Sequence, residues 1–358
     1  MESRFSGSLL GLAIGDALGY PAEFRSRAQI IAELGPGGIE DFVALKDPRF
    51  SRPVILGPDP PPGTYTDDTQ MTLALADGLL DVTNAPDPDL DLDELMPAIG
   101  RRFVAWADSP QNDRAPGQTC LTGCANLRRG VPWREAGVLD SKGCGSAMRV
   151  APIGLLYAHD LDRVATVARA SSLLTHGHDA AVEGAAAAAL MVALALQGMG
   201  PQPMYHELRR RCAGRSPDFD RCLERVPGLL GRPPAEALVS GGLGEGWVAE
   251  EAVASAIYCF WRHPDDYRAA VREGVNTDGD SDSIAAITGS VLGARLGQEG
   301  IPATWVERVE NRALLEQTAA RLYRARVALL APVQKQSRGC FSGAAHHGAV
   351  SRASRSVR

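Results

Sequence analysis

The stretch Ser6–Gly19, SGSLLGLAIGDALG, places Gly11, Gly15 and Gly19 four residues apart within an otherwise apolar run. Residues spaced by four positions lie on one face of an α-helix. The three glycines therefore predict a smooth helix face against which a second helix packs closely. The alanine-rich run Ala180–Ala195 also carries small side chains along its length, and we interpret it in the same way.

Other long segments also favour helix, while strands of alternating apolar and polar residues joined by hairpin turns are nearly absent. The sequence therefore predicts an all-α domain. The predicted helices are Ser6–Leu18, Gln70–Val82, Asp91–Ala107, Asp162–Leu174, Ala180–Gln197, Gly246–Trp261, Ser283–Leu296 and Arg312–Leu330.

Three segments are expected to be irregular. Gly35–Thr66 contains seven prolines and the run GPDPPPG, which cannot propagate a helix, and it leads directly into an acidic motif. Asp108–Gln118 is a shorter predicted loop. Val333–Arg358 has five basic residues and no acidic ones, and we expect a disordered tail there. The predicted organisation is one domain over residues 1–332 followed by the tail, residues 333–358.

The composition limits the classes of function. A net charge of −6 and a pI near 5.7 argue against sequence-independent binding of nucleic acid. The seven cysteines form no CxxC pair, which indicates free thiols in a reducing cytoplasm. The N-terminus lacks the basic region of a signal peptide, and the apolar run Gly184–Leu196 is too short to span a bilayer. We expect a cytoplasmic protein and a monomer.

The first acidic motif, Thr66–Gln70, reads TDDTQ and precedes the apolar run MTLALADGLL. Asp67 is a suitable N-cap residue, and Gln70 three positions later completes a capping-box pattern. The same carboxylates can instead bind a cation. The motif taken alone favours capping and leaves ligation open.

The second acidic motif, Asn276–Ile284, reads NTDGDSDSI. One of its aspartates can cap the following helix, but a single cap does not require three. An EF-hand loop that began at Asp278 would need glycine and glutamate where the chain has Ser283 and Gly289, so this alternative is excluded.

Carboxylates and hydroxyls from both motifs predict a site for hard divalent cations. Oxygen ligands suit Mg²⁺, Mn²⁺ or Ca²⁺ rather than zinc. Two ions would reduce the combined charge of five carboxylates from −5 to −1, and paired ions are a recurring device for activating water. The candidate ligands are Glu23, Thr66, Asp67, Asp68, Asp280, Asp282 and Ser283.

The order of several segments resembles the ADP-ribosylglycohydrolase family, which includes the dinitrogenase-reductase-activating glycohydrolase and the ADP-ribosyl-acceptor hydrolases. The resemblance runs from about Ser6 to Pro302. The segments that carry it are GLAIGDALGYPAEF, YTDDTQMTLALADGLL, RFVAWADSPQNDRAPGQTC, SKGCGSAMRVAPIGLLY, SSLLTHGHDAAVEGA and DGDSDSIAAITGSVLGA.

The resemblance implies a compact, single-domain orthogonal helical bundle with two Mg²⁺ or Mn²⁺ ions at the base of an ADP-ribose cleft. Thr66, Asp67 and Asp68 match the first metal-binding motif of the family. Asp280, Asp282 and Ser283 match the second motif, with Asp282 in the place of a carboxylate that bridges both ions. Glu23 matches a mobile acidic residue that reaches the metals.

The resemblance also implies contacts with the substrate. It places Gly143, Cys144, Gly145, Ser146 and Met148 around the diphosphate, and His176 near the ribose. Many family members have asparagine and glycine where this chain has Cys144 and Ser146, and threonine in place of Ser283. The fit around the phosphates is therefore expected to differ.

Each of these residues also has a structural interpretation. Glu23 can be a surface carboxylate, and His178 can cap a helix end. Cys144 is expected to be a packed thiol rather than a nucleophile, because no acid–base partner lies nearby in the sequence. Arg114 and Arg149 can pair with phosphates or with acidic residues of the fold.

The expected reaction is hydrolysis of the bond between C1″ of ADP-ribose and an acceptor, with Asp67 or Asp68 as general base and Glu23 as a lid-like residue. Arginine is the first choice of acceptor; serine, O-acetyl-ADP-ribose and a nucleobase stay open. The alternatives are a phosphohydrolase that cleaves the diphosphate and a non-catalytic protein that binds ADP-ribose.

Overall fold

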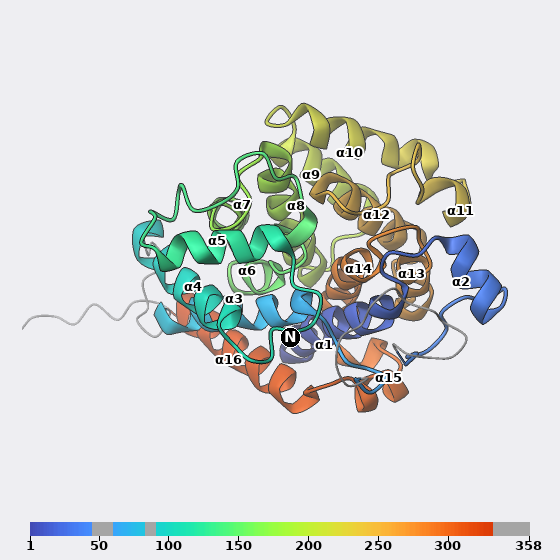
Figure 1. The fold of residues 1–358 in the computed structure, drawn as a ribbon, viewed down its shortest axis with the longest axis horizontal. Helices are drawn as coiled ribbons and strands as arrows, with labels where there is room; N and C mark the ends of the chain where they lie inside the picture. The colour runs from blue at the N-terminus through green and yellow to red at the C-terminus, as the bar shows by residue number, and fades with distance from the viewer. Residues whose placement is uncertain (45–59, 83–90, 332–358) are drawn as a thin grey trace, which may run out of the picture.

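The computed structural model describes residues 1–44, 60–82 and 91–331. Within these ranges it contains sixteen α-helices packed around one hydrophobic core, and isolated bridges but no β-strand (Figure 1). This confirms the all-α prediction. The helices are α1 (Glu2–Gly19), α2 (Arg27–Leu34), α3 (Asp67–Val82), α4 (Leu92–Ala107), α5 (Gln118–Arg128), α6 (Ala151–Leu156), α7 (Leu161–Ser172), α8 (Asp179–Leu196), α9 (Pro201–Cys212), α10 (Pro217–Leu229), α11 (Pro234–Ala237), α12 (Ala249–Arg262), α13 (Tyr267–Val275), α14 (Ser281–Leu296), α15 (Ala303–Arg308) and α16 (Arg312–Leu330).

Every predicted helical segment overlaps an observed helix, and α16 has the predicted bounds. The described parts of the predicted proline-rich loop, residues 35–44 and 60–66, contain no helix, and neither does residue range 108–117. The middle of the proline-rich loop and the predicted tail lie outside the described residues. Eight further helices were not predicted: α2, α5, α6, α9, α10, α11, α13 and α15.

The predicted glycine face of α1 packs directly against the backbone of α14. A Cβ atom added to Gly11 would lie 2.3 Å from the carbonyl oxygen of Gly289, and one added to Gly289 would lie 2.1 Å from that of Gly11. At the end of α1, a Cβ on Gly19 would lie 2.4 Å from Cα of Asp282. No side chain fits between the two helices, so the C-terminal end of α1 is held against the N-terminal end of α14.

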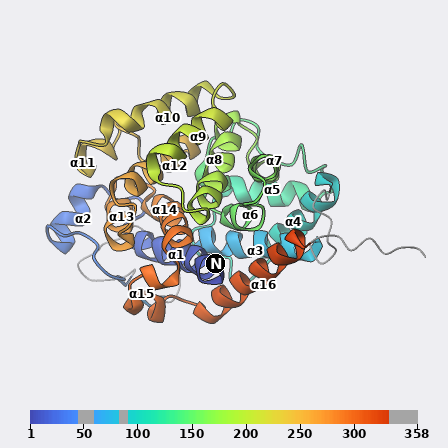
Figure 2. The same ribbon diagram turned by 180° about the vertical axis from the view of Figure 1, so that it is seen from behind.

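Helix α8 is the alanine-rich helix at the centre of the molecule (Figures 1 and 2). It is long and apolar enough to cross a membrane by length and composition, but 89% of it is buried inside the protein. Gly184 packs against Ala249 of α12, where an added Cβ would lie 2.6 Å from the alanine Cβ. Helix α8 is thus a buried core helix, with the close packing that its small side chains predicted.

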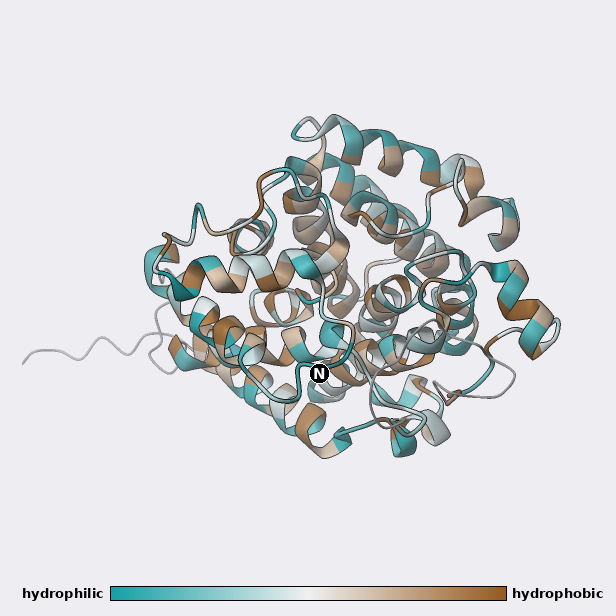
Figure 3. Cartoon of the chain, in the orientation of Figure 1, coloured by the Kyte–Doolittle hydropathy of each residue, from teal (hydrophilic) through white to brown (hydrophobic). Residues whose placement is uncertain are grey.

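Helix α10, unlike the apolar α8, has one hydrophobic face and one hydrophilic face. Helix α10 alternates hydrophobic and hydrophilic residues along its turns (Figure 3). Its buried residues are Phe219, Cys222, Leu223 and Val226, a spacing of three and four that places them on one helix face. The charged residues between them face solvent, which is the arrangement of a helix that covers a core.

Candidate active site

A cavity of about 380 Å³ contains most of the residues that the sequence singled out. It is bordered by the N-terminal ends of α3, α5 and α14, by the segment that follows α1, and by the loop before α6. The predicted residues that line it are Glu23, Asp67, Asp68, Gly143, Cys144, Gly145, Met148, His176, Asp280, Asp282 and Ser283. A larger recess of about 510 Å³ lies beyond Trp247 and contains none of the predicted residues.

The first acidic motif begins α3, and both of its aspartates are buried. Oδ2 of Asp67 accepts a hydrogen bond from the amide of Gly117 at 3.1 Å. Oδ2 of Asp68 is buried and has no hydrogen-bond partner within the described part of the chain. Asp68 therefore presents a carboxyl oxygen that the described residues do not satisfy.

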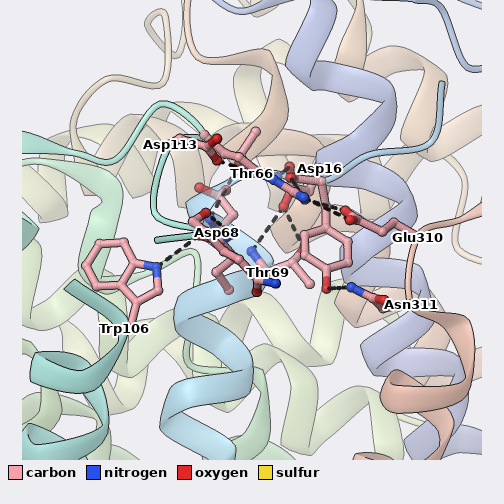
Figure 4. Close-up of polar contacts among 12 residues, drawn as sticks. Asp16, Thr66, Asp68, Thr69, Trp106, Asp113, Glu310 and Asn311 are labelled. Atoms are coloured by element: carbon pink, nitrogen blue, oxygen red, sulfur yellow. Dashed lines mark hydrogen bonds and ion pairs between the residues drawn. The ribbon is translucent and has the colours of Figure 1, made fainter. Parts of the chain in front are cut away.

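The capping box predicted at this motif is wrong. Gln70 does not reach back to the helix start; it donates to the carbonyl of Gln111 and accepts from the indole of Trp106. Instead, Asp16 of α1 accepts hydrogen bonds from the amides of Thr66 and Thr69 at 2.9 and 3.0 Å, and from the Thr69 hydroxyl at 2.6 Å (Figure 4). Because α1 provides the cap, the aspartates of α3 are left to face the cavity.

The second acidic motif begins α14. Asp280 is the N-cap, with Oδ1 3.4 Å from the amide of Ser283, and its Oδ2 accepts from the thiol of Cys144 at 2.8 Å. Asp282 lies in the first turn and is buried. Asp278 points elsewhere, because its Oδ1 accepts from the backbone amide of Arg27 at 2.6 Å. The first aspartate of the motif, Asp278, therefore holds the start of α2.

The carboxylates of the two motifs and Asp16 form one buried cluster. Burial, followed by repulsion from Asp282, raises the pKa of Asp16 to about 7. Burial is also the largest cause that raises the pKa values of Asp67, Asp68 and Asp280 well above the usual range, and the neighbouring aspartates raise them further. A cluster of this kind holds its full negative charge only when cations are close to it.

The donor set fits hard divalent cations in its chemistry, since it offers carboxylate and hydroxyl oxygens and the unsatisfied oxygen of Asp68. No three His, Cys, Asp or Glu side chains in the described ranges already surround a common point. A bound cation would therefore also need neutral oxygens, from Thr66, Ser283 or water. The residues present are compatible with Mg²⁺ or Mn²⁺, and more so than with zinc.

A second part of the cavity wall, in contact with the aspartates, is suited to an anion. The N-terminal end of α5 faces the cavity with Gly117, Gln118 and Thr119. The loop Gly143–Gly145 lies beside it, and a Cβ on Gly145 would lie 2.8 Å from Sγ of Cys120 and 2.9 Å from Cε1 of His176. Free amides at a helix start and in a tight glycine loop bind phosphate groups.

An aromatic pair borders the cavity on the side of Glu23. Phe24 has a φ of +67° and is 60% exposed, and its ring stacks on Trp247 with centroids 4.9 Å apart. The amide of Phe24 donates to the carbonyl of Gly279 at 3.0 Å, next to Asp280. Glu23 is buried, in contrast to the alternative of a surface carboxylate.

Three predicted residues do not line the cavity. Thr66 is buried behind it, where its hydroxyl accepts from the amide of Asp68 at 3.3 Å. Ser146 is also buried and donates to the carbonyl of Ala181, which anchors the glycine loop to α8.

Arg114 is the third such residue, and the structure places it away from the predicted phosphate contact. Its guanidinium is bound by both carboxylate oxygens of Glu310, near the Asn311 shown in Figure 4. The guanidinium thus already has an acidic partner within the fold. Its backbone carbonyl still supports the site, because it accepts from the amide of Asp67 at 3.3 Å.

His178 and the cysteines are structural. His178 caps the start of α8, where Nδ1 accepts from the amide of Ala180 at 3.1 Å, rather than binding carbonyls at a helix end as expected. All six cysteines in the described ranges are free and buried. Burial, followed by the negative charge of Asp280, raises the pKa of the Cys144 thiol well above its usual range. Cys144 is therefore a neutral thiol, as expected of a packed residue.

Asp16, Phe24 and Trp247 belong to the site but were not predicted from the sequence. For Asp16 a signal existed, since it is a lone carboxylate in an apolar helical run and directly follows one of the packing glycines. Nothing in the sequence links Phe24 with Trp247, because the contact between them forms only in the folded chain.

Comparisons with known proteins show the family to which the chain belongs. The family model described as ADP-ribosylglycohydrolase matches residues 1–330. ADP-ribosylhydrolase ARH3 of Mus musculus is 29% identical over 368 residues, which cover 90% of this chain and 91% of the relative. ADP-ribosylarginine hydrolase Tri1 of Pseudomonas putida (strain GB-1) is 27% identical over 333 residues, which cover 89% of this chain and 78% of the relative.

A solved structure described as an ADP-ribosylglycohydrolase-related protein complex has the same fold, with a TM-score of 0.70 and 27% identity. The match covers 91% of this chain and 98% of that one. Together with the family match over nearly the whole described chain, these similarities support hydrolysis of ADP-ribose conjugates as the activity. The chain belongs to the ADP-ribosylglycohydrolase family.

Proposed function

We propose that the protein is a metal-dependent hydrolase that cleaves the bond between C1″ of ADP-ribose and an acceptor, and so reverses ADP-ribosylation. The observation that carries this proposal is the placement of two opposite kinds of binding group on one cavity. The buried aspartates of α3 and α14 form one wall, and the helix start and glycine loop form the other. A ribose diphosphate needs both kinds of group.

Two Mg²⁺ or Mn²⁺ ions fit the acidic wall. The residues that would hold them are Glu23, Thr66, Asp67, Asp68, Asp280, Asp282 and Ser283. Such ions supply activation of water and binding of ribose hydroxyls. The N-terminal ends of α3 and α14 point toward the same carboxylates and favour their charged forms.

Asp68 is the better candidate for the general base. The hydrogen bond from the Gly117 amide occupies one oxygen of Asp67, whereas Oδ2 of Asp68 has no partner among the described residues and can receive a proton from water. As the bond to the acceptor breaks, positive charge develops on the ribose, and the surrounding carboxylates stabilise it. Glu23 lines the cavity after the short 3₁₀ turn Tyr20–Ala22 that follows α1, and we assign it the role of closing the site over the ribose.

The anion-binding part of the cavity wall would hold the diphosphate. The amides that would serve as donors are those of Gly145 and of Gln118 and Thr119 at the start of α5, because the Gly143 amide already donates to the Ser141 hydroxyl and the Cys144 amide to the Trp247 carbonyl. His176 lies against the same glycines. Cys144 of this loop contacts the acidic wall, because its thiol lies within hydrogen-bond distance of Oδ2 of Asp280 and of the Ser283 hydroxyl. This contact couples the position of the phosphates to that of the metals.

Arginine is the acceptor we favour. A guanidinium leaving group is a planar cation, and an acidic cavity bordered by Phe24 and Trp247 suits it. The name of the relative Tri1 states this acceptor for that protein. Serine-linked, O-acetyl and nucleobase-linked ADP-ribose are the competing substrates.

The test is a panel of these four conjugates incubated with the full-length protein and Mg²⁺, Mn²⁺ or EDTA. Release of intact ADP-ribose is followed by chromatography. We expect release from the arginine conjugate, with loss of about a hundredfold or more in the variants Asp68→Asn and Asp282→Asn. Asp162→Asn is the matched control, because this aspartate is 89% exposed and pairs with Arg211 on the surface.

The products separate the alternatives. AMP and ribose phosphate would identify a phosphohydrolase, and calorimetric binding of ADP-ribose without any turnover would identify a non-catalytic relative. Undiminished release in both aspartate variants would contradict the proposed site.

A further inference from the structure

Arg149 is a basic residue that is fully buried in the fold. Its guanidinium lies 4.4 Å from the centre of the Phe103 ring and contacts the sulfur atoms of Met71 and Cys120. One of its nitrogens, Nη2, donates to the hydroxyl of Thr175 at 2.8 Å and to the carbonyl of Ser171 at 3.1 Å. No acidic side chain among the described residues forms an ion pair with it, in contrast to one of the two interpretations from the sequence.

Thr175 connects Arg149 with His176 through its hydroxyl group. Oγ1 of Thr175 lies 2.8 Å from Nδ1 of the His176 ring, and both side chains are buried. The ring itself is fixed by its backbone, since the His176 amide donates to Ser172 and the His176 carbonyl accepts from the Ser172 hydroxyl. The three side chains form a continuous chain of hydrogen bonds from Arg149 to the cavity wall.

The direction of each hydrogen bond in this chain is determined by chemistry. A guanidinium only donates, so Thr175 accepts from Arg149. The hydroxyl hydrogen of Thr175 then needs an acceptor, and Nδ1 of His176 is the one acceptor that the described residues place within hydrogen-bond distance. A hydrogen on Nδ1 would leave this buried hydroxyl without an acceptor, which is unfavourable.

We infer that Arg149 and Thr175 are positioning residues that hold His176 as the neutral tautomer with its hydrogen on Nε2, so that His176 acts as a fixed hydrogen-bond donor to the anionic part of the ligand. Nε2 is the ring nitrogen that faces the glycine loop: a Cβ on Gly143 would lie 3.1 Å from it, and a Cβ on Gly145 3.3 Å. The identity of the ligand in this inference rests on the proposed function, whereas the tautomer of His176 does not depend on it.

The neutral form of the ring has independent support. Burial, together with the positive charge of Arg149, lowers the pKa of His176 to about 3. His176 is therefore neither a cation that attracts phosphate nor a base poised for proton transfer near neutral pH. A neutral ring donates from only one nitrogen, and the contact with Thr175 decides which one.

The test measures the tautomer directly. The full-length protein is labelled with ¹⁵N-histidine, and the ring nitrogens of His176 are observed by long-range ¹H–¹⁵N correlation, with His176→Asn for assignment. We expect a protonated Nε2 and an unprotonated Nδ1 in the wild type and in Thr175→Ser. In Thr175→Val the constraint is lost, and a population with the hydrogen on Nδ1 appears.

Binding of ADP-ribose, measured by calorimetry, provides the second readout. Thr175→Val is expected to bind at least about tenfold more weakly, because it weakens a hydrogen bond to a charged group, and Thr175→Ser is expected to restore binding. Thr288→Val is the matched control: its hydroxyl is also fully buried but donates to a helix carbonyl at 2.8 Å in α14.

A hydrogen on Nδ1 in the wild type overturns the inference, and so does a tautomer that is unchanged in a folded Thr175→Val variant. If Thr175→Val does not fold, the wild type and Thr175→Ser still decide the question. If the tautomer is as expected but neither the wild type nor any variant binds ADP-ribose, the assignment of Nε2 as the donor stands and the proposed function fails.

Discussion

Gly15 of α1 lies so close to Ala285 of α14 that a Cβ atom added to the glycine would stand 2.1 Å from the alanine carbonyl oxygen and 2.5 Å from its carbonyl carbon. This contact sets the distance between the two helices that carry Asp16 and Asp282. Because the neighbouring atoms belong to a helix backbone, they cannot move aside as a flexible side chain would.

Gly15→Ala is therefore expected to lower the free energy of unfolding by about 3 kcal/mol and to reduce activity in the folded fraction. Gly228→Ala is the control: this glycine lies in the exposed part of α10 with no atom within 4 Å of an added Cβ, and its replacement is expected to stabilise by about 0.5–1 kcal/mol. Urea denaturation measures both. Equal stabilities of the two variants would show that the helices have room to separate.

Removal of metal is expected to make the stability depend strongly on pH. Burial and repulsion raise the pKa of Asp16 to about 7 from an ordinary value of 3.8. A carboxyl group with a raised pKa stabilises the folded state fully below its unfolded pKa, and this contribution is lost as pH rises through about 7. The melting temperature of the protein in EDTA should fall between pH 5 and pH 8.

Mg²⁺ or Mn²⁺ should reverse this fall, because a bound cation favours the charged carboxylates. The increase in melting temperature on adding metal is thus expected to be larger at pH 8 than at pH 5. An increase that is the same at both pH values would mean that the ions bind away from the buried cluster.

Asp16→Asn tests the cap that α1 provides for α3. Both oxygens of Asp16 accept hydrogen bonds, and an amide group replaces one of them by a donor. At pH 5 we expect unfolding to be easier by about 1–3 kcal/mol. At pH 8 the difference should shrink or change sign, because the variant also removes a negative charge from the cluster. Chemical denaturation of the metal-free protein at the two pH values measures this; a constant difference would contradict it.

Cys144→Ser is expected to keep most of the activity. The Cys144 thiol acts as a hydrogen-bond donor to Asp280, and a hydroxyl can make the same contact. Its raised pKa leaves it protonated, so iodoacetamide should inactivate the wild type slowly or not at all near neutral pH. Complete loss of activity in the serine variant would instead point to a nucleophilic thiol.

The sequence predicted the longer helices, such as the apolar α8 and α16, together with the close packing of α1. It did not predict α5 or α9. Helix α5 has no side-chain cap and contains a glycine, Gly123, which is required because an added Cβ would lie 2.5 Å from the carbonyl oxygen of Leu174. Helix α9 begins with prolines and is mostly polar. Their stability comes from neighbours that sequence spacing does not reveal.

The acidic residues of the site were predictable because they are clustered in the chain, at residues 66–68 and 280–283. Their partners were not. Asp16 reaches α3 across fifty positions, and Trp247 meets Phe24 only because the segment after α1 pairs with Gly279. Arg114 was assigned to the substrate because its carboxylate partner, Glu310, lies far away in the sequence.

The packing of α1 on α14 also has a consequence for the order of events during synthesis. The glycine face and the aspartates of α3 leave the ribosome long before the helix that covers them. At about 5–20 residues per second, they wait roughly ten seconds or more for α14. A nascent chain halted before residue 280 therefore carries Asp16, Asp67 and Asp68 of the acidic cluster, lacks Asp280 and Asp282, and has an uncovered helix face. Activity appears late in synthesis, and chaperones have a defined interval in which to bind.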